Sequence, residues 1–139
     1  MPGGFRQVQS IVMKRKHISL KGDDKYGHWW TELGGGESYG WWPAEPLSTW
    51  KTLTGVNGDL NGQAMFGGTP TTDPHDGDPA EEEFHPKVSV CDKRTDDEIK
   101  DCIRGFASSY SGEWRWTFGG GQNCHTFQES LMSHCDLSE

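Results

Sequence analysis

Three consecutive glycines at positions 34–36 separate two aromatic segments that alternate like half-buried strands. The first segment covers residues 26–33 and the second covers residues 37–42. Tryptophan and threonine suit a pleated surface, and glycines accept the backbone conformations of a tight turn. The pattern therefore predicts a β-hairpin, whose second strand is ended by Pro43 and Pro46.

Two helices are predicted in the C-terminal part of the chain. Thr95 to Glu98 forms a capping box with acidic residues in the first turn, where the helix dipole favours them. A single apolar stripe follows at helical spacing: Ile99, Cys102, Ile103, Phe106, Ala107 and Tyr110. A last helix begins near Cys124 and is expected to bury Phe127, Leu131 and Cys135.

The remaining segments are weaker strands and one long connection. Residues 44–86 contain many turn signals and are expected to be a mostly irregular insertion, a length typical of functional or partly mobile loops. Further short strands are expected at 7–13, 17–20, 87–91 and 113–118. The order of the elements predicts one α+β domain over residues 1–139, built around a small antiparallel sheet.

Charge and hydropathy exclude some classes of partner. The net charge of −8 argues against nucleic acid, and the short basic run Lys14 to Lys16 is interpreted as an exposed strand end. No stretch approaches the ~20 apolar residues of a membrane span, and the N-terminus lacks an apolar signal-peptide core. We therefore expect a soluble protein with no membrane span, exported by a route without a classical signal peptide or cut from a longer polypeptide.

The chain has four cysteines and no C-x-x-C pair. Cys102 and Cys135 lie on the apolar faces of the predicted helices and Cys91 ends a strand, so these three are interpreted as structural. A Cys91–Cys102 bridge is one option in an oxidising compartment, and the sequence leaves the pairing open.

Cys124 carries the sharpest chemical signal. Asn123 is a good N-cap and places Cys124 in the first helical turn, where unpaired N–H groups and the dipole lower the pKa of a thiol. The preceding glycines let a carbonyl group approach the sulfur, and the Cys124 N–H and the Gln122 side chain are candidate oxyanion donors. The alternative is a buried structural cysteine that begins a helix.

A thiolate nucleophile needs a base within reach, and six histidines compete for that role. His28 lies in the aromatic strand beside Trp29, where a ring can be held at a fixed geometry and partly desolvated. His125 neighbours Cys124, but consecutive helical residues point in different directions. His28 is therefore the preferred base, and the alternative is a ring that only packs in the core.

Together these residues resemble the circularly permuted papain-like proteins of the NlpC/P60 superfamily, which include the lecithin:retinol acyltransferase-like enzymes. In that group the His lies on an early strand, a glycine-turn hairpin follows, and the Cys opens a late helix in an Asn-Cys motif. The resemblance covers roughly residues 24–43 and 95–137. It implies a permuted papain-like fold with the nucleophile helix at the C-terminus, and a cysteine peptidase or amidase that uses no cofactor and no metal.

The family usually has a further polar residue that orients the His from the strand after the hairpin. Hairpin register puts that position near Gly40, which cannot serve. Ser38 and Glu37 are the remaining candidates on that strand.

The acidic stretch from Asp73 to His85 has three interpretations. Alternating carboxylates around glycine are typical of calcium loops, but prolines interrupt this one and the closing Glu of an EF-hand is missing. A solvated loop is favoured, and a middle interpretation is that the insertion walls the substrate cleft.

The leading hypothesis is a cysteine hydrolase that cleaves an amide bond with Cys124 as nucleophile and His28 as base. The resemblance implies a peptidoglycan stem peptide as substrate, and an antibacterial effector or toxin domain delivered to the periplasm of a target cell, with an immunity protein as partner. The expected oxyanion and substrate contacts are Gln122, Asn123, Trp29 and Trp42. The alternatives are an acyltransferase or thioesterase that uses the same Cys, and a non-enzymatic module that grips glycan or peptide with an exposed Trp-rich hairpin.

Overall fold

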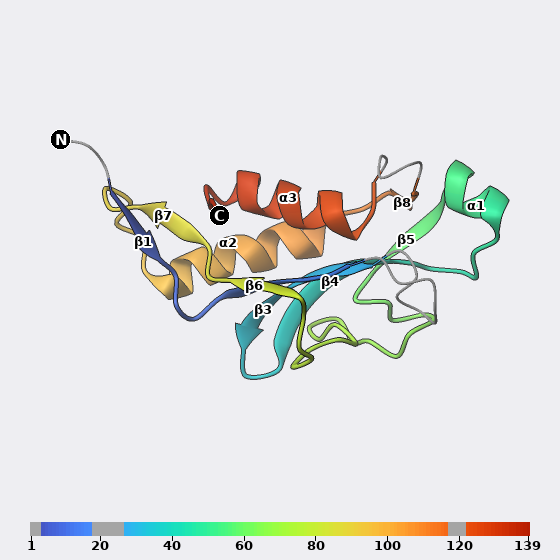
Figure 1. The fold of residues 1–139 in the computed structure, drawn as a ribbon, viewed down its shortest axis with the longest axis horizontal. Coiled ribbons are helices and arrows are strands. Elements are labelled where there is room, and N and C mark those ends of the chain that lie inside the picture. The colour runs from blue at the N-terminus through green and yellow to red at the C-terminus, as the bar shows by residue number, and fades with distance from the viewer. Residues whose placement is uncertain (1–3, 18–26, 117–121) are drawn as a thin grey trace.

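The computed structural model describes residues 4–17, 27–116 and 122–139. Two helices lie on one side of an antiparallel sheet, and a long irregular segment lies on the other side (Figure 1). The elements in chain order are β1 (Phe5–Gln7), β2 (Val12–Lys16), β3 (His28–Gly34), β4 (Glu37–Pro43), α1 (Thr49–Thr54), β5 (Val56–Leu60), β6 (Glu82–Phe84), β7 (Lys87–Ser89), α2 (Asp96–Ser109), β8 (Glu113–Trp114) and α3 (Cys124–His134). The predicted α+β class with antiparallel pairing is confirmed.

The main sheet has the strand order β6-β2-β3-β4-β5-β8, and β1 and β7 form a separate pair. The hairpin of β3 and β4 lies at its centre, as the glycine turn predicts. Gly34, Gly35 and Gly36 have φ values of 88°, 65° and 87°, a region that residues with a Cβ rarely adopt. The three glycines therefore make this tight connection possible.

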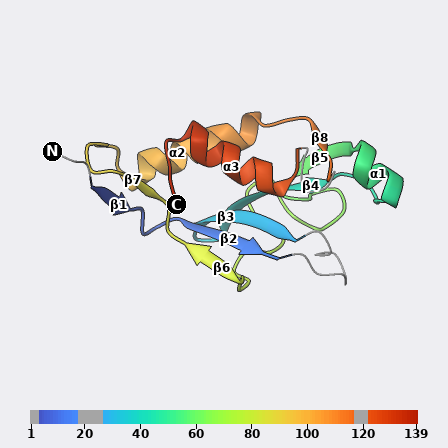
Figure 2. The same cartoon turned by 45° about the horizontal axis from the view of Figure 1, so that its top comes forward.

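Both C-terminal helices begin where their caps predict. Thr95 and Glu98 form the expected capping box of α2, and Asn123 caps α3 through the backbone N–H groups of its first turn. Figure 2 shows the two helices side by side over the sheet. Their buried side chains form the core with residues from β2, β3 and β4, and each fully buried aliphatic side chain contributes about 1.5–3 kcal/mol.

The tryptophans of the hairpin are covered on both faces of the sheet. Trp41 stacks on Phe127 of α3, whereas Trp42 packs against Phe66 on the opposite face. The exposed fractions of Trp30, Trp41 and Trp42 are 0%, 3% and 5%. The expectation of an exposed Trp-rich surface is therefore wrong for these three side chains, because α3 covers Trp41 and the insertion covers Trp30 and Trp42.

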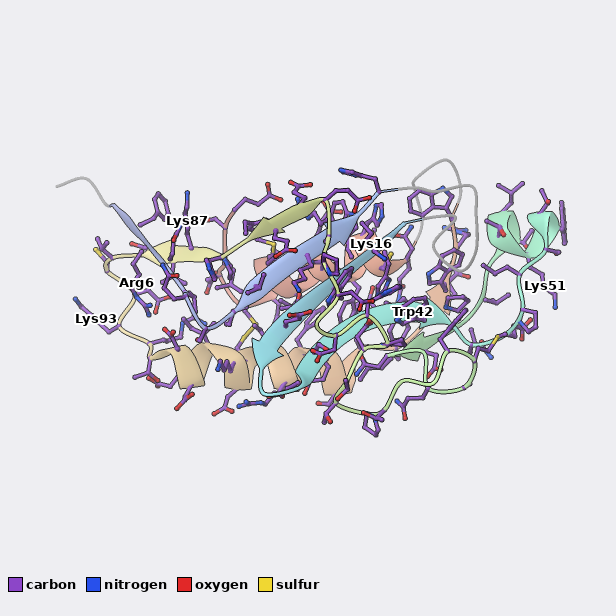
Figure 3. All side chains as sticks on the ribbon, turned by 60° about the horizontal axis from the view of Figure 1, so that its bottom comes forward. Arg6, Lys16, Trp42, Lys51, Lys87 and Lys93 are labelled. Carbon is purple, nitrogen blue, oxygen red and sulfur yellow. A yellow bond between two sulfur atoms is a disulfide. The ribbon has the colours of Figure 1, made fainter. Side chains whose placement is uncertain are left out.

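The insertion is more ordered than its turn signals predict. It contains α1, and its strands β5 and β6 join the main sheet beside β4 and β2. The sequence of β5 is Val-Asn-Gly-Asp-Leu, and its three central residue types are depleted in strands. This segment is therefore a strand because it pairs with β4 and β8, not because of its own propensity. Residues 61–81 then run along the sheet face opposite the helices, beside Trp42 of β4 (Figure 3).

A disulfide joins Cys102 of α2 to Cys135 at the C-terminal end of α3. This pairing replaces the Cys91–Cys102 option, because Cys91 lies exposed after β7 and is free. The two bonded residues were expected on apolar helix faces, and those faces meet. The bridge therefore ties the C-terminal end of α3, the helix that begins at Cys124, to α2.

Some expectations fall partly outside the described residues. These are residues 18–20 of the 17–20 strand, residue 26 of the 26–33 strand, residues 117 and 118 of the 113–118 strand, and the glycines before Gln122. Within the described ranges, no helix is both long and apolar enough to cross a membrane.

Candidate active site

His28, the first residue of β3, is held by a carboxylate that comes from the insertion. Its Nε2 lies 2.9 Å from Oδ2 of Asp73, and the exposed fraction of each of the two residues is 1%. The sequence prediction of a fixed and desolvated imidazole at this position agrees with this arrangement. The partner of the ring is neither Ser38 nor Glu37, which were the expected candidates.

Three donors surround the Asp73 carboxylate, and the first of them is His28 Nε2. Its Oδ2 also accepts from Trp42 Nε1 at 2.8 Å, and its Oδ1 accepts from the His75 backbone N–H at 2.8 Å. The Asp73 backbone N–H donates to Ser38 Oγ at 2.9 Å, so Ser38 holds the loop rather than the imidazole. Burial alone would raise the pKa of Asp73, but the charge and hydrogen bond of His28 and the other two donors outweigh it and lower that pKa. Asp73 is therefore ionised near neutral pH.

Gly40 provides the space for this pair. A Cβ atom at position 40 would lie 2.3 Å from Asp73 Oδ2 and 2.8 Å from His28 Nε2. The hairpin register therefore correctly identifies position 40 as the position of β4 that faces His28. Gly40 contributes by leaving space, because it has no side chain. A carboxylate from another part of the chain fills the position where a polar side chain of β4 was expected.

Aromatic rings enclose the imidazole. The ring centroid of His28 lies 3.9 Å from that of Trp42, 5.5 Å from that of Trp30 and 5.3 Å from that of His75. A carboxylate accepts hydrogen bonds only, so the neutral imidazole carries its proton on Nε2. Nδ1 then has the lone pair and can accept a proton, which is the state a general base requires.

Cys124 begins α3 as predicted, and its exposed fraction is 2%. Burial raises the pKa of its thiol to about 12, although hydrogen bonds from the backbone N–H groups of Trp29, Cys124 and His125 act to lower it. The expectation of a lowered pKa is therefore wrong, because the desolvation of this side chain exceeds the effect of the helix start. The resting side chain is a neutral thiol.

The sulfur lies beside the strand that carries His28. The backbone N–H of Trp29 donates a hydrogen bond to the sulfur, and Trp29 directly follows His28 in the chain. The charge of Asp73 is near enough to raise the pKa of the thiol. The pairing of β3 with β4 reaches Trp30↔Gly40, and the next residue of β4 pairs with β5. The thiol therefore meets β3 just beyond the end of that ladder.

The thiol and the imidazole approach β3 from different sides. Because strand side chains alternate, His28 faces the insertion together with Trp30, whereas the Trp29 ring faces α3. Among the described residues, no hydrogen bond directly joins the Cys124 thiol to the His28 ring.

Other predicted site residues have structural contacts. The Gln122 amide donates to the Ser111 carbonyl, and Asn123 caps α3 while its amide donates to the Arg115 carbonyl. Glu37 forms an ion pair with Arg104 of α2 on the helix side of the molecule. Neither Gln122 nor Glu37 is aimed at the His28–Asp73 pair in this structure.

The two tryptophans predicted to contact substrate differ in exposure. Trp42 is buried and donates to Asp73, so it positions the carboxylate. Trp29 is partly exposed and lies between Arg15 and His125. The Trp29 ring centroid is 4.0 Å from Arg15 Cζ and 4.1 Å from the His125 ring centroid. The Trp29 backbone N–H also donates to the Cys124 thiol, so this residue lies beside the sulfur.

The acidic stretch is not uniformly solvated. Glu81, Glu82 and Glu83 are exposed, but Asp73 is buried, and His75 Nδ1 lies 2.8 Å from Asp78 Oδ2. Within the ranges that the structure describes, no group of three His, Cys, Asp or Glu side chains is arranged to hold a metal ion. The expectation of a solvated loop is therefore wrong for its first residue, the one that the site uses.

Asp73 is the residue that sequence reasoning missed. Its local signal is an Asp-Pro turn in a run of carboxylates, which is typical of an exposed loop.

Comparison of the chain with models of known families, with curated proteins and with solved structures finds no match.

Proposed function

We propose that the protein is a cysteine hydrolase in which Cys124, His28 and Asp73 act as nucleophile, base and orienting carboxylate. The observation that carries this proposal is the fully buried His28–Asp73 pair beside the segment that contacts the Cys124 sulfur. Nucleophilic catalysis requires an imidazole with a fixed tautomer and a free thiol that can reach it, and here both groups lie at the same end of β3.

Acylation begins from the neutral thiol. As the sulfur attacks the carbonyl carbon of an amide, the S–C bond forms and the carbonyl electron pair moves to oxygen. The thiol proton passes to His28 Nδ1, while Asp73 stabilises the imidazolium through the Nε2 hydrogen bond. The C–N bond then breaks, and Nδ1 returns the proton to the leaving amine.

Deacylation uses the same groups. Nδ1 takes a proton from a water molecule, whose oxygen attacks the thioester, and the S–C bond breaks as the thiol recovers that proton. Both steps require the thiol and Nδ1 to meet where the pairing of β3 with β4 has ended. Catalytic hydrogen bonds that are absent at rest often form only when substrate is bound.

The substrate and setting follow from the family resemblance and from the disulfide. The permuted papain-like order of His28 and Cys124 favours a peptide amide, in particular a peptidoglycan stem peptide. The Cys102–Cys135 bridge is consistent with an oxidising space such as the periplasm, where such bonds persist. We therefore propose an antibacterial effector or toxin domain that acts there, with an immunity protein as its partner.

The test uses the two free cysteines as a matched pair. Purified wild type, Cys124→Ala and Cys91→Ala are incubated with peptidoglycan fragments, and the products are identified by mass spectrometry. We expect amide cleavage by wild type and Cys91→Ala, no cleavage by Cys124→Ala, and an acyl group trapped on Cys124. Equal cleavage by Cys124→Ala would contradict the proposal, and transfer of the acyl group to an acceptor other than water would change it to an acyltransferase.

A further inference from the structure

The His125 side chain has a buried polar atom that the proposed mechanism does not use. Its Nε2 is shielded from solvent and has no hydrogen-bond partner among the described residues. Buried polar side-chain atoms in proteins are rarely left without a partner, because an unpaired one costs free energy. An atom left in this state beside a candidate active site therefore needs an explanation.

Two aromatic contacts fix the ring. His125 stacks on Trp29 with ring centroids 4.1 Å apart and planes 15° apart, and it meets Trp116 edge-on at 4.7 Å and 87°. The Arg15 guanidinium packs on the other face of Trp29. The imidazole is therefore held between Trp29 and Trp116, and these contacts set its orientation before any ligand arrives.

His125 and Cys124 lie at the same place in the site. Trp29 contacts both of them, through its backbone N–H to the Cys124 sulfur and through its ring to His125. The charge of His28 also reaches the His125 ring, just as the charge of Asp73 reaches the Cys124 thiol. His125 and Cys124 thus contact the same residue of β3, which directly follows His28.

The first turn of α3 has few donors left for an oxyanion. The backbone N–H groups of His125 and Thr126 donate to Asn123 Oδ1, and the Asn123 N–H donates to Thr126 Oγ1. The Gln122 amide, the donor expected from the sequence, is bonded to the Ser111 carbonyl. The Cys124 N–H therefore needs a second donor from another group if two hydrogen bonds are to stabilise the oxyanion.

We propose that the His125 side chain binds the carbonyl oxygen of the acyl substrate, with Nε2–H as the second oxyanion donor beside the Cys124 backbone N–H. This assignment rests on the proposed cysteine hydrolase function. As the S–C bond forms and the carbonyl electron pair moves to oxygen, Nε2–H donates a hydrogen bond and keeps its proton.

The electrostatics of the ring agree with this role. Burial lowers the pKa of His125 to about 4, and the charges of His28 and Arg15 act in the same direction. The ring is therefore neutral near pH 7 and carries a single N–H. A neutral donor stabilises developing negative charge without delivering a proton that would divert the reaction.

The first test separates the donor from the ring. His125→Phe keeps a flat ring for the stack on Trp29 but has no donor, and His125→Gln keeps a donor. We expect His125→Phe to lower kcat on the order of 10²- to 10³-fold with little change in KM, and His125→Gln to recover part of that loss. His134→Phe, on the exposed end of the same helix, is the matched control and should retain wild-type kcat.

The second test uses a peptide aldehyde, whose carbonyl carbon bonds to the thiol and whose oxygen takes the oxyanion position. In a Cys91→Ser background, His125→Phe should weaken inhibition by the aldehyde on the order of 10²-fold. It should leave the alkylation rate of Cys124 by iodoacetamide unchanged, because that reaction forms no oxyanion. Should the Phe variant not fold, His125→Leu takes its place.

The outcomes separate the two proposals. Wild-type kcat and aldehyde affinity in His125→Phe would overturn the oxyanion role alone, and so would a parallel fall in the alkylation rate, which would indicate a role in positioning the thiol. Equal turnover by Cys124→Ala and wild type would overturn the hydrolase function and the oxyanion role together.

Discussion

Asp73 Oδ2 lies 2.9 Å from His28 Nε2, although the two residues are 45 positions apart and belong to different structural units of the chain. His28 begins a strand of the central hairpin, and Asp73 belongs to the irregular part of the insertion. The insertion therefore supplies a residue of the candidate site as well as a cover for the sheet.

Removal of the Asp73 carboxylate should affect catalysis more than folding. We expect Asp73→Ala to lower kcat on the order of 10³-fold, because the imidazole loses both its fixed tautomer and the charge that stabilises its protonated form. The kcat of Asp73→Asn should lie between those of wild type and Asp73→Ala. The Asn oxygen can still accept from His28, but its amide group faces the His75 N–H donor. Steady-state kinetics checks this, and Asp76→Ala in the same loop should behave as wild type.

A methyl group at position 40 should disrupt the same pair. In Gly40→Ala the new Cβ would lie 2.3 Å from Asp73 Oδ2, so the carboxylate must move away from His28. We expect kcat to fall on the order of 10²-fold, the size of effect that a displacement of about 1 Å produces at an active site.

The control for that change is Gly105→Ala. The space around Gly105 in α2 is open, so this variant should keep wild-type kcat and raise the free energy of unfolding by about 0.5–1 kcal/mol through helix propensity. Urea unfolding and steady-state kinetics of Gly40→Ala and Gly105→Ala check both expectations. Equal kcat in the two variants would contradict the role assigned to Gly40.

The two free cysteines should differ in reactivity. Burial raises the pKa of the Cys124 thiol to about 12, whereas Cys91 is exposed. Since the thiolate is the reactive form, iodoacetamide at pH 8 should alkylate Cys91 faster than Cys124 by at least about 10²-fold. Mass spectrometry of peptides over time checks this, and a Cys124 that reacts first would indicate a resting thiolate.

Loss of the Cys102–Cys135 bridge should destabilise the fold. The bridge closes a loop of 33 residues, for which chain entropy predicts a stabilisation of about 3–4 kcal/mol. Cys102→Ala should therefore lower the free energy of unfolding by that amount, as measured in urea, and Cys91→Ala should leave it unchanged. A stability that does not respond to reduction by dithiothreitol would contradict this prediction.

The contribution of Asp73 to stability should depend on pH. The pKa of Asp73 is lower in the folded protein than in the unfolded chain, chiefly because His28 outweighs the effect of burial. Its contribution is therefore complete above about pH 4 and is lost as the pH falls through the folded-state pKa. The difference in unfolding free energy between wild type and Asp73→Asn, measured in urea, should shrink below pH 4. A difference in unfolding free energy that stays constant with pH would contradict the lowered pKa of Asp73.

Local patterns predicted the elements whose residues determine their own structure. The capping residues Thr95 and Asn123 predicted the starts of α2 and α3, and the glycine turn predicted the hairpin. Sequence singled out Cys124 because it follows the N-cap Asn123, and His28 because it lies in the aromatic strand beside Trp29.

The features that sequence did not predict depend on distant partners. Residues 56–60 have weak strand propensity and become β5 through pairing with β4 and β8. Asp73 resembles any exposed turn residue until Trp42 and His28 surround it, and the raised pKa of Cys124 comes from side chains that bury it. Cys102 pairs with Cys135 because two helix faces meet, which spacing along the chain does not reveal.

The contact between Gly40 and Asp73 also constrains how the chain can diverge. A polar side chain at position 40 would occupy the space of the Asp73 carboxylate, so the two positions can change only together. We expect related sequences to covary here, with glycine at position 40 wherever the loop supplies the acid. Where position 40 carries its own polar group, the loop is released from this constraint and is expected to vary freely in length.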